Sequence, residues 1–437
     1  MITSPAWKDR KYAVLGLARS GRATVEALLA SGADVLVWDD RAEAREPFAG
    51  RSAIGNPLEA DLTGYAGVVV SPGVPLNTHP IKPHADRFGV PVIGDVELFA
   101  QARADLPPHK VVGITGTNGK STTTALVHHM LKTAGVPTTM GGNIGLPILE
   151  QDPLPEGGVY VLELSSYQID LTYSLDCDVA VLLNITPDHL DRYDWDFGKY
   201  AASKARLFEM QSSGSTALIY DDLRDASDAV LWIVDDFEDG TRPIEADVEG
   251  MVRIDLDGLT LSPSLRGPHN HANASAAFYT GSYLGITEPM MEGALRTFTG
   301  LPHRMERVAE ISGVSYVNDS KGTNTAASAP ALAAFDNIHW ILGGLAKEPG
   351  LGECEAELGH VKAAYTIGKA GPDFAALLEG RVPVERCETL DCAVSTAAAK
   401  AQAGDTVLLS PACASFDQYA DFEKRGDHFR ALVEGLK

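Results

Sequence analysis

Short apolar runs alternate with stretches of helical periodicity through the first hundred residues of the chain. The runs at 12–15, 35–40, 67–73 and 91–94 predict buried strands, and the stretch 22–33 between the first two predicts an amphipathic helix. Because crossover helices join strands that run in the same direction, this alternation predicts a parallel sheet. The first part of the chain is therefore expected to form a Rossmann-like α/β domain.

The same pattern continues after a polar, proline-bearing stretch at 101–110, which we interpret as a linker. Further strands are expected at 159–166, 179–186, 315–319, 339–344, 363–368 and 406–412. No internal repeat is evident. We therefore predict an α/β protein of three domains with boundaries at 1–100, 101–302 and 303–437.

Composition narrows the class of protein. The chain has 437 residues, with 45% apolar and 22% charged residues, and the net charge of −23 comes from 36 basic and 59 acidic side chains. Such an acidic chain lacks the basic footprint of a nucleic-acid-binding protein. No apolar run approaches the roughly 18 residues that span a bilayer. The densest acidic stretch, at 220–240, is expected to be a solvated face.

The N-terminal residues lack the pattern of a signal peptide, and the five cysteines are scattered and odd in number. Neither disulfides nor a zinc site is indicated by their spacing. We expect a cytoplasmic, monomeric protein with reduced thiols, no nucleic-acid partner and no membrane span.

The stretch GITGTNGKST at 113–122 lies between an apolar run and the helical stretch 124–135. It departs from the usual phosphate loop, GxxxxGK[ST], because Ile114 stands where the first glycine is expected. Backbone amides at a helix N-terminus can still bind phosphate oxygens. The alternative is a tight turn with an incidental Lys-Ser pair. An ATP or GTP site is favoured, formed by Gly116, Thr117, Asn118, Gly119, Lys120, Ser121 and Thr122, in a central domain of the P-loop ATPase type with a mainly parallel sheet.

Oxygen and nitrogen ligands for a metal follow two predicted strands of the same domain. Glu163 and Ser165 lie at the end of the strand 159–166, and His189 follows the next strand. The carboxyl ends of parallel strands face the ligand crevice. Each residue alone could be a structural polar group. Together with the phosphate loop, they favour a Mg²⁺ site, in which Ser121 is a further ligand.

Two more segments are candidates for nucleoside binding. Asn270 and Asn273 lie three residues apart at the start of a predicted helix and share a face, which suits an adenine edge, although an N-cap and an exposed amide are the alternative. In the first domain, GLARSG and Asp39 form a degenerate dinucleotide fingerprint, and SPGVP at 71–75 is a second tight loop.

The order of eight motifs along the chain resembles the Mur ligase family of amide-forming enzymes of cell-wall synthesis. They are GTNGKST, GGNIGLP, LELSSYQ, DHLDRY, HNHAN, GLPHRME, NDSKGTN and SPACASFDQY. The string at 408–429 is most similar to the family members that add D-glutamate. The chain departs from the family in GLARSG, where many members have a GLGxTG-like turn, and in GGLAKEPG at 343–350. The DNPR signature of the diaminopimelate-adding members is absent.

The resemblance implies an ATP-dependent ligase that joins D-glutamate to UDP-N-acetylmuramoyl-L-alanine through an acyl phosphate, with two Mg²⁺ ions and a carbamylated Lys204. It implies catalytic roles for Lys120, His189, Lys204 and Arg304, and metal binding by Ser121, Glu163, Ser165, His189 and Lys204. ATP would be bound by the loop residues with Asn270, Asn273, Arg304 and Asp319. The UDP-sugar substrate would be bound by Arg19, Ser20, Asp39, Asp40, Arg41, Ser71, Gly73, Asn143 and Gln168. D-glutamate would be bound by Lys321, Thr323, Lys347, Ser415, Phe416 and Phe422.

Three other functions remain open at this point. Folylpolyglutamate synthase, a relative of the family, shares the phosphate loop and the metal residues, but it would not need the first domain or SPACASFDQY. A P-loop switch or regulator would bind nucleotide without a third domain rich in polar groups. An NAD(P) oxidoreductase would account for GLARSG and would be stabilised by NADH.

Overall fold

The computed structural model describes residues 1–219, 261–265, 268–347 and 349–436. The described residues of Met1–Leu256 and Ala272–Ala294 form one unit, and those of Asp257–His271 and Leu295–Lys437 form a second. The acidic stretch 220–240 lies outside the described residues. Among them, no helix is long and apolar enough to cross a membrane.

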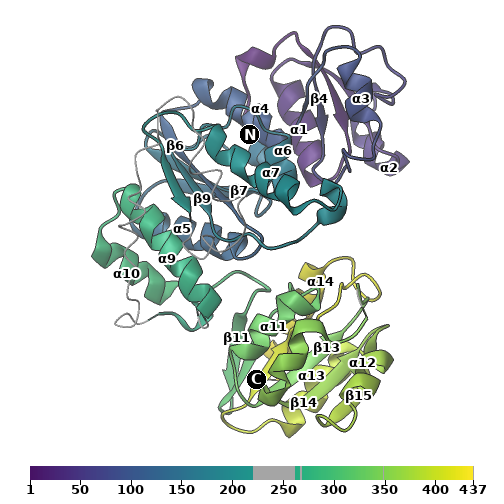
Figure 1. Ribbon diagram of the computed structural model, residues 1–437, viewed down its shortest axis with the longest axis vertical. Coiled ribbons are helices and arrows are strands. Elements are labelled where there is room, and N and C mark those ends of the chain that lie inside the picture. Colours follow the sequence, from purple (N-terminus) through teal and green to yellow (C-terminus); the bar gives the residue numbers. More distant parts are fainter. Residues whose placement is uncertain (220–260, 266–267, 348, 437) are drawn as a thin grey trace. The chain divides into compact units, whose positions relative to one another are not determined.

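The first sheet is parallel and has the strand order β3-β2-β1-β4-β5. Its strands are β1 (Lys11–Leu15), β2 (Asp34–Trp38), β3 (Ala53–Ile54), β4 (Tyr65–Val70) and β5 (Val92–Ile93). Its helices are α1 (Arg19–Ala30), α2 (Ala42–Arg45), α3 (Ile81–Asp86) and α4 (Asp95–Ala102). In Figure 1, α1 and α3 flank β4. This order matches the first five strands of the Rossmann order, 3-2-1-4-5-6, which agrees with the Rossmann-like domain that the sequence predicted.

The second sheet is also parallel, in the order β10-β9-β6-β8-β7. Its strands are β6 (His109–Thr115), β7 (Thr138–Gly142), β8 (Gly158–Glu163), β9 (Val179–Leu182) and β10 (Thr216–Ile219). The helices of this part are α5 (Lys120–Thr133), α6 (Ser166–Asp170), α7 (Phe197–Glu209), α9 (Pro268–Tyr283) and α10 (Glu288–Thr297). Helix α5 packs against β6, β7 and β8, whereas α7 packs against β9 and α6.

The third sheet is mixed, in the order β11-β12-β16-β13-β14-β15. Only β11 runs antiparallel, pairing with β12 at the edge. Its strands are β11 (Glu306–Ile311), β12 (Val314–Asn318), β13 (Ile338–Gly343), β14 (Val361–Ile367), β15 (Val384–Glu388) and β16 (Thr406–Leu409). Its helices are α11 (Thr325–Ala333), α12 (Gly371–Leu378), α13 (Leu390–Lys400) and α14 (Phe422–Glu434).

Short 3-10 helices complete the described structure: Pro5–Trp7, Glu46–Phe48, Arg103–Asp105, Ile148–Glu150, Leu190–Tyr193, Pro263–Leu265 and Gly352–His360. The stretch 101–110 is not the free linker that its composition predicted. Helix α4 continues to Ala102, and β6 begins at His109.

The first two sheets share a hydrophobic core. One cluster of buried side chains includes Val14 and Phe99 from the first hundred residues and Tyr160 and Phe208 from the next hundred. Glu97 of α4 reinforces this junction, because its carboxylate accepts the main-chain N–H groups of Tyr173 at 2.7 Å and Ser174 at 3.0 Å. Three sheets confirm the predicted α/β class, whereas the domain boundaries stay a prediction.

All five cysteines are free thiols, and none forms a disulfide. Four are buried, and burial raises the pKa of Cys177, Cys354, Cys387 and Cys413 to about 12. Cys392, on the first turn of α13, is partly exposed.

Candidate functional site

The glycine-rich loop joins β6 to α5 and requires glycine at two positions. Gly116 and Gly119 have φ angles of 149° and 83°, which residues other than glycine rarely adopt. A Cβ atom at residue 119 would also lie 2.2 Å from Oδ1 of Asn273. Glycine therefore allows the adenine-site candidate on α9 to approach the loop closely.

Asn184, which follows β9, holds the loop in place. It accepts the N–H of Thr117 at its main-chain oxygen (3.0 Å) and the N–H of Asn118 at Oδ1 (2.9 Å), and its Nδ2 donates to the oxygen of Asn118 (3.1 Å). Two of the amides that the sequence predicted to bind phosphate thus donate to Asn184 in this structure. Asn184 was missed, although its position directly after a buried strand could have indicated it.

Two lysines converge on the carbonyl oxygen of Gly116. Nζ of Lys120 donates to it at 2.8 Å and to the oxygen of Thr117 at 2.6 Å, and Nζ of Lys204 donates to it at 3.0 Å. Lys204 lies on α7, and although a lysine on a helix is usually exposed, only 1% of it is accessible. Its burial, and then the charge of Lys120, lower the pKa of Lys204 to about 7.

Glu163 is the best-placed metal ligand among the candidates. It ends β8 opposite Ile114 of β6 and is buried. Its Oε1 accepts Nδ2 of Asn143 at 2.9 Å, while its buried Oε2 has no hydrogen-bond partner. A carboxylate oxygen that is buried without a donor is costly to desolvate, and a cation would compensate that cost. The acidic residue therefore fits a metal at this place.

The other metal candidates differ in their surroundings. Ser165 caps α6 by accepting the N–H of Gln168 at 3.3 Å and donating to its Oε1 at 3.0 Å, so both residues have structural partners here. Ser121 is buried on the first turn of α5. The side chain of His189 is 57% exposed on a backbone with φ of 52°. Among the described residues, no group of three or more His, Cys, Asp or Glu side chains could hold a metal ion.

Both candidate adenine ligands on α9 are buried, rather than one capping the helix and the other being exposed. Thr123 donates to Oδ1 of Asn273 at 3.3 Å, which ties α9 to α5. Nδ2 of Asn270 donates to the main-chain oxygen of Ser264 at 3.4 Å.

In the first domain, Asp39 organises the loop GLARSG. Its Oδ2 accepts the N–H of Leu17 at 2.8 Å, and its Oδ1 accepts the N–H and Nε of Arg41 at 3.0 and 3.2 Å. Burial raises the pKa of Asp39, but the hydrogen bonds from Arg41 and Leu17 outweigh it and lower the pKa overall. Ser71 donates to the oxygen of Gly16 at 3.0 Å, so the two predicted loops are in contact.

The remaining first-domain candidates lie around these loops. Arg19 begins α1 and donates to the oxygen of Gly145 at 2.9 Å, within the GGNIGLP motif that contains Asn143. Asp40 accepts the indole N–H of Trp38 at 3.3 Å. Ser20 lies on the first turn of α1, and Gly73 lies on the loop after β4.

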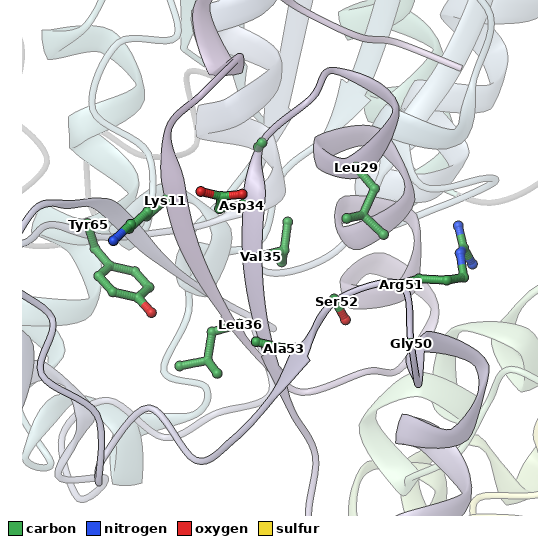
Figure 2. A pocket seen from close by; sticks show the side chains of 11 residues that line it. Lys11, Leu29, Asp34, Val35, Leu36, Gly50, Arg51, Ser52, Ala53 and Tyr65 are labelled. Atoms are coloured by element: carbon green, nitrogen blue, oxygen red, sulfur yellow. The ribbon is translucent and has the colours of Figure 1, made fainter.

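A cavity of about 480 Å³ opens at the end of the first sheet where strands β1, β2 and β4 begin (Figure 2). Its lining includes Lys11, Asp34 and Tyr65, the first residues of β1, β2 and β4. The candidate residues of this domain follow the carboxyl ends of those strands. The cavity is therefore not part of the candidate site.

In the second unit, Asp319 and Ser415 lie on loops at the carboxyl ends of β12 and β16. Asp319 is buried; its Oδ1 accepts the N–H of Met305 at 3.2 Å, its Oδ2 accepts Oγ of Ser410 at 2.7 Å, and burial raises its pKa to about 7. Ser415 is buried, whereas Phe416 next to it is 70% exposed. Arg304 lies on the turn just before β11.

Phe422 begins α14, and Nζ of Lys321 lies 4.0 Å from the centre of its ring. Thr323 follows on the loop after β12. Lys347 is exposed on a loop that pairs with the 414 segment through the N–H of Leu345 and the oxygen of Ala414, at 2.8 Å. These contacts place the lysine and aromatic candidates on neighbouring loops.

Sequence reasoning missed Arg425, although it belongs to the quoted C-terminal string. Its buried guanidinium donates to Oγ and the main-chain oxygen of Ser320, at 3.0 and 2.8 Å, and to the oxygen of Cys413 at 3.1 Å. Arg425 therefore fastens the loop of Lys321 to the loop of Ser415.

The fold and these loops describe a three-sheet α/β protein with a glycine-rich loop between a parallel strand and a helix. The chain matches the Mur ligase middle domain at residues 114–281 and the Mur ligase glutamate ligase domain at 303–413. It is 61% identical to the UDP-N-acetylmuramoylalanine–D-glutamate ligase of Novosphingobium aromaticivorans, over 100% of this chain and 97% of that one. It is 57% identical to the corresponding ligase of Sphingopyxis alaskensis, over 100% of both chains.

Among solved structures, the MurF ligase of Thermotoga maritima in complex with ADP matches with a TM-score of 0.58 at 16% identity, covering 98% of this chain and 99% of that one. This likeness shows the fold. The chain belongs to the Mur ligase family, and within it to the group of UDP-N-acetylmuramoylalanine–D-glutamate ligases.

Proposed function

We propose that the chain joins D-glutamate to UDP-N-acetylmuramoyl-L-alanine with conversion of ATP to ADP and phosphate, as a step of cytoplasmic peptidoglycan precursor synthesis. The observation that carries this proposal is the convergence of Lys120 and Lys204 on the Gly116 carbonyl, which follows β6, while the buried Glu163 ends the neighbouring strand β8. Family membership and the use of ATP by Mur ligases support the same reaction.

In the proposed reaction, the alanine carboxylate attacks the γ-phosphorus of ATP, which gives an acyl phosphate and ADP. The amine of D-glutamate then attacks the acyl carbon, and the tetrahedral intermediate releases phosphate as the amide forms. Bringing a unit negative charge to about 4 Å from a phosphate costs roughly 4 kcal/mol at an effective dielectric of 20. Lys120 and Arg304 would offset this repulsion.

Two Mg²⁺ ions would supply further charge neutralisation when bound. Ser121 and Glu163, with Ser165 nearby in sequence, are the proposed ligands of one ion, and His189 with a carbamylated Lys204 those of the other. The partnerless Oε2 of Glu163 supports the first assignment. Carbamylation needs a neutral amine, which adds CO₂ and loses a proton, and the burial of Lys204 favours the neutral form.

The substrate assignments follow the order of the sheets. Residues 1–100 would bind the UDP moiety, residues 101–302 would bind ATP, and residues 303–437 would bind D-glutamate. Asn270 and Asn273 would contact adenine, and Asp319 the ribose. We propose that the protein acts as a monomer in the cytoplasm.

Phosphate release from ATP tests the reaction. The protein would receive Mg²⁺, UDP-N-acetylmuramoyl-L-alanine and, separately, D-glutamate, L-glutamate, L-lysine or meso-diaminopimelate. We expect release only with D-glutamate, and a loss of at least about 1,000-fold in Lys120→Ala, because the loop lysine neutralises transferring phosphate. Lys132→Ala, on the exposed last turn of the same helix, is the control.

Release with a different amino acid would keep the ligase class and overturn the choice of D-glutamate. Absence of release with every amino acid would favour a P-loop regulator instead. Stabilisation by NADH would favour an oxidoreductase.

A further inference from the structure

The segment 188–193, which follows β9 and contains His189, reaches the first-domain loop 71–77. Arg192 donates to three successive main-chain oxygens of that loop: Nη2 to Pro72 at 3.1 Å and to Val74 at 2.9 Å, and Nη1 to Gly73 at 3.4 Å. Nδ2 of Asn77 returns a hydrogen bond to the oxygen of Asp191 at 2.9 Å. The contact is thus reciprocal.

Arg192 is itself held in a fixed orientation. Its guanidinium lies 4.2 Å from the centre of the Tyr167 ring, and its main-chain N–H donates to the oxygen of His189 at 3.0 Å. The Tyr167 ring also lies against the imidazole of His189, with ring centres 5.4 Å apart. One stacked aromatic ring therefore contacts both the arginine that reaches the first domain and the candidate metal ligand.

The next residue ties the segment to the buried lysine. The hydroxyl of Tyr193 donates to Oδ2 of Asp170 at 2.9 Å and lies 3.3 Å from Oγ of Ser203, the neighbour of Lys204. Displacement of the segment would disturb both proposed ligands of the second metal ion. The planar fork of an arginine is what allows one side chain to address three carbonyls, and a lysine ammonium lacks that shape.

We propose that Arg192 is a positioning residue that couples the UDP-sugar loop 71–77 to the His189 segment. Binding of the sugar nucleotide orders the loop 71–77. Because Arg192 contacts this loop, the His189 segment becomes ordered as well, close to the proposed site where the alanine carboxylate is activated. This inference rests on the proposed function, because it takes the loop to be the sugar-nucleotide site.

The test compares Arg192→Ala and Arg192→Lys with Arg206→Ala. Arg206 is a matched control: it also stacks on an aromatic ring (Tyr173, 5.1 Å) and also donates to two main-chain oxygens, those of Asp170 and Thr172, at 3.2 and 2.8 Å. Its partners lie within the central domain rather than across to the first. Asn77→Ala removes the reciprocal contact while leaving Arg192 in place.

We expect Arg192→Ala to raise KM for the sugar nucleotide about tenfold and to lower kcat, with KM for ATP within about twofold of the wild type. Arg192→Lys should resemble Arg192→Ala, and Asn77→Ala should show a smaller change of the same kind. Arg206→Ala should lower the melting temperature without changing the ratio of the two KM values.

Amide hydrogen exchange gives a readout independent of turnover. In the wild type, the sugar nucleotide or UDP alone should slow exchange in both 71–77 and 188–193. In Arg192→Ala, the slowing should be confined to 71–77. Equal behaviour of the Arg192→Ala and Arg206→Ala variants, or full rescue by lysine, would overturn the coupling. A wild type that turns over D-glutamate but shows no protection of 188–193 would overturn the inference alone, whereas a wild type that neither binds UDP nor releases phosphate would overturn the proposed function as well.

Discussion

The loop after β1 and the loop after β6 occupy the same place in two parallel sheets but are held differently. The central loop is fixed by partners from its own domain, because Asn184, after β9, and Lys204, on α7, contact its backbone. The first-domain loop contacts Asp39 and Ser71 of its own sheet, but Arg19 and the adjoining 71–77 loop also contact the central domain. A phosphate loop can therefore be complete within one domain, whereas the proposed sugar-nucleotide site depends on two.

The largest effect on stability is expected from a substitution in the hydrophobic core that the first two sheets share. Asp95 begins α4 at the junction; it is buried, one carboxylate oxygen has no hydrogen-bond partner, and burial raises its pKa to about 6. The folded state binds this proton more tightly than the unfolded state, so the protonated carboxyl contributes its full stability at pH values below the unfolded pKa. That stability is lost as the pH rises through the folded pKa. The Asp95→Asn variant should therefore be more stable than the wild type above pH 6, by up to about 3 kcal/mol for a pKa raised to about 6. Near pH 3 the two proteins should have similar stability.

Urea unfolding of both proteins between pH 3 and pH 8 measures this difference. Parallel stability profiles would mean that the Asp95 carboxyl is solvated. The junction between the two sheets would then be looser than the shared core indicates.

Asn184→Ala tests whether the central loop depends on its own sheet. The variant loses two side-chain hydrogen bonds to the backbone of Asn118, so KM for ATP should rise about 100-fold while KM for the sugar nucleotide stays near the wild-type value. Steady-state kinetics with each substrate varied in turn give both constants. A similar rise in both would show that the two loops are not held independently.

Asp39→Asn is the corresponding change in the first domain and should have the smallest effect. An amide keeps one acceptor for the N–H of Leu17 but loses the charge that pairs with Arg41. KM for the sugar nucleotide should rise about tenfold, and KM for ATP should not change. Titration calorimetry with UDP checks the same loss as binding, and unchanged affinity would remove Asp39 from the proposed site.

The sequence predicted those parts of the fold that have a continuous pattern. Buried central strands such as β8 and β9 contain uninterrupted apolar runs and were found. Two edge strands were missed for physical reasons: β3 has only two residues, and β7 reads TTMGG, which lacks the apolar character of a core strand. β11 was missed as well, because it is a partly exposed antiparallel strand without a buried run.

The candidate site residues were likewise predicted only where a local sequence pattern marks them. Lys120 and Glu163 belong to motifs whose spacing has a chemical meaning. Asn184, Arg192 and Arg425 act by donating to or accepting from backbone atoms 66, 120 and 105 residues away. No local spacing encodes such contacts. Of the three residues, Asn184 alone could have been indicated, by its position directly after a buried strand. Likewise, the 1% exposure of Lys204 depends on the packing of α7, which helical periodicity alone did not indicate.

The uneven burial of the five thiols has a practical consequence. A maleimide reacts with a thiolate that it can reach, and four of the cysteines are buried with a pKa near 12, which leaves Cys392 as the accessible one. The native protein thus offers a single attachment point for a fluorophore, on helix α13, which belongs to the unit that contains the third sheet. Paired with a second dye introduced near the glycine-rich loop, it would let energy transfer follow the distance between the two units during turnover, without removing any natural cysteine.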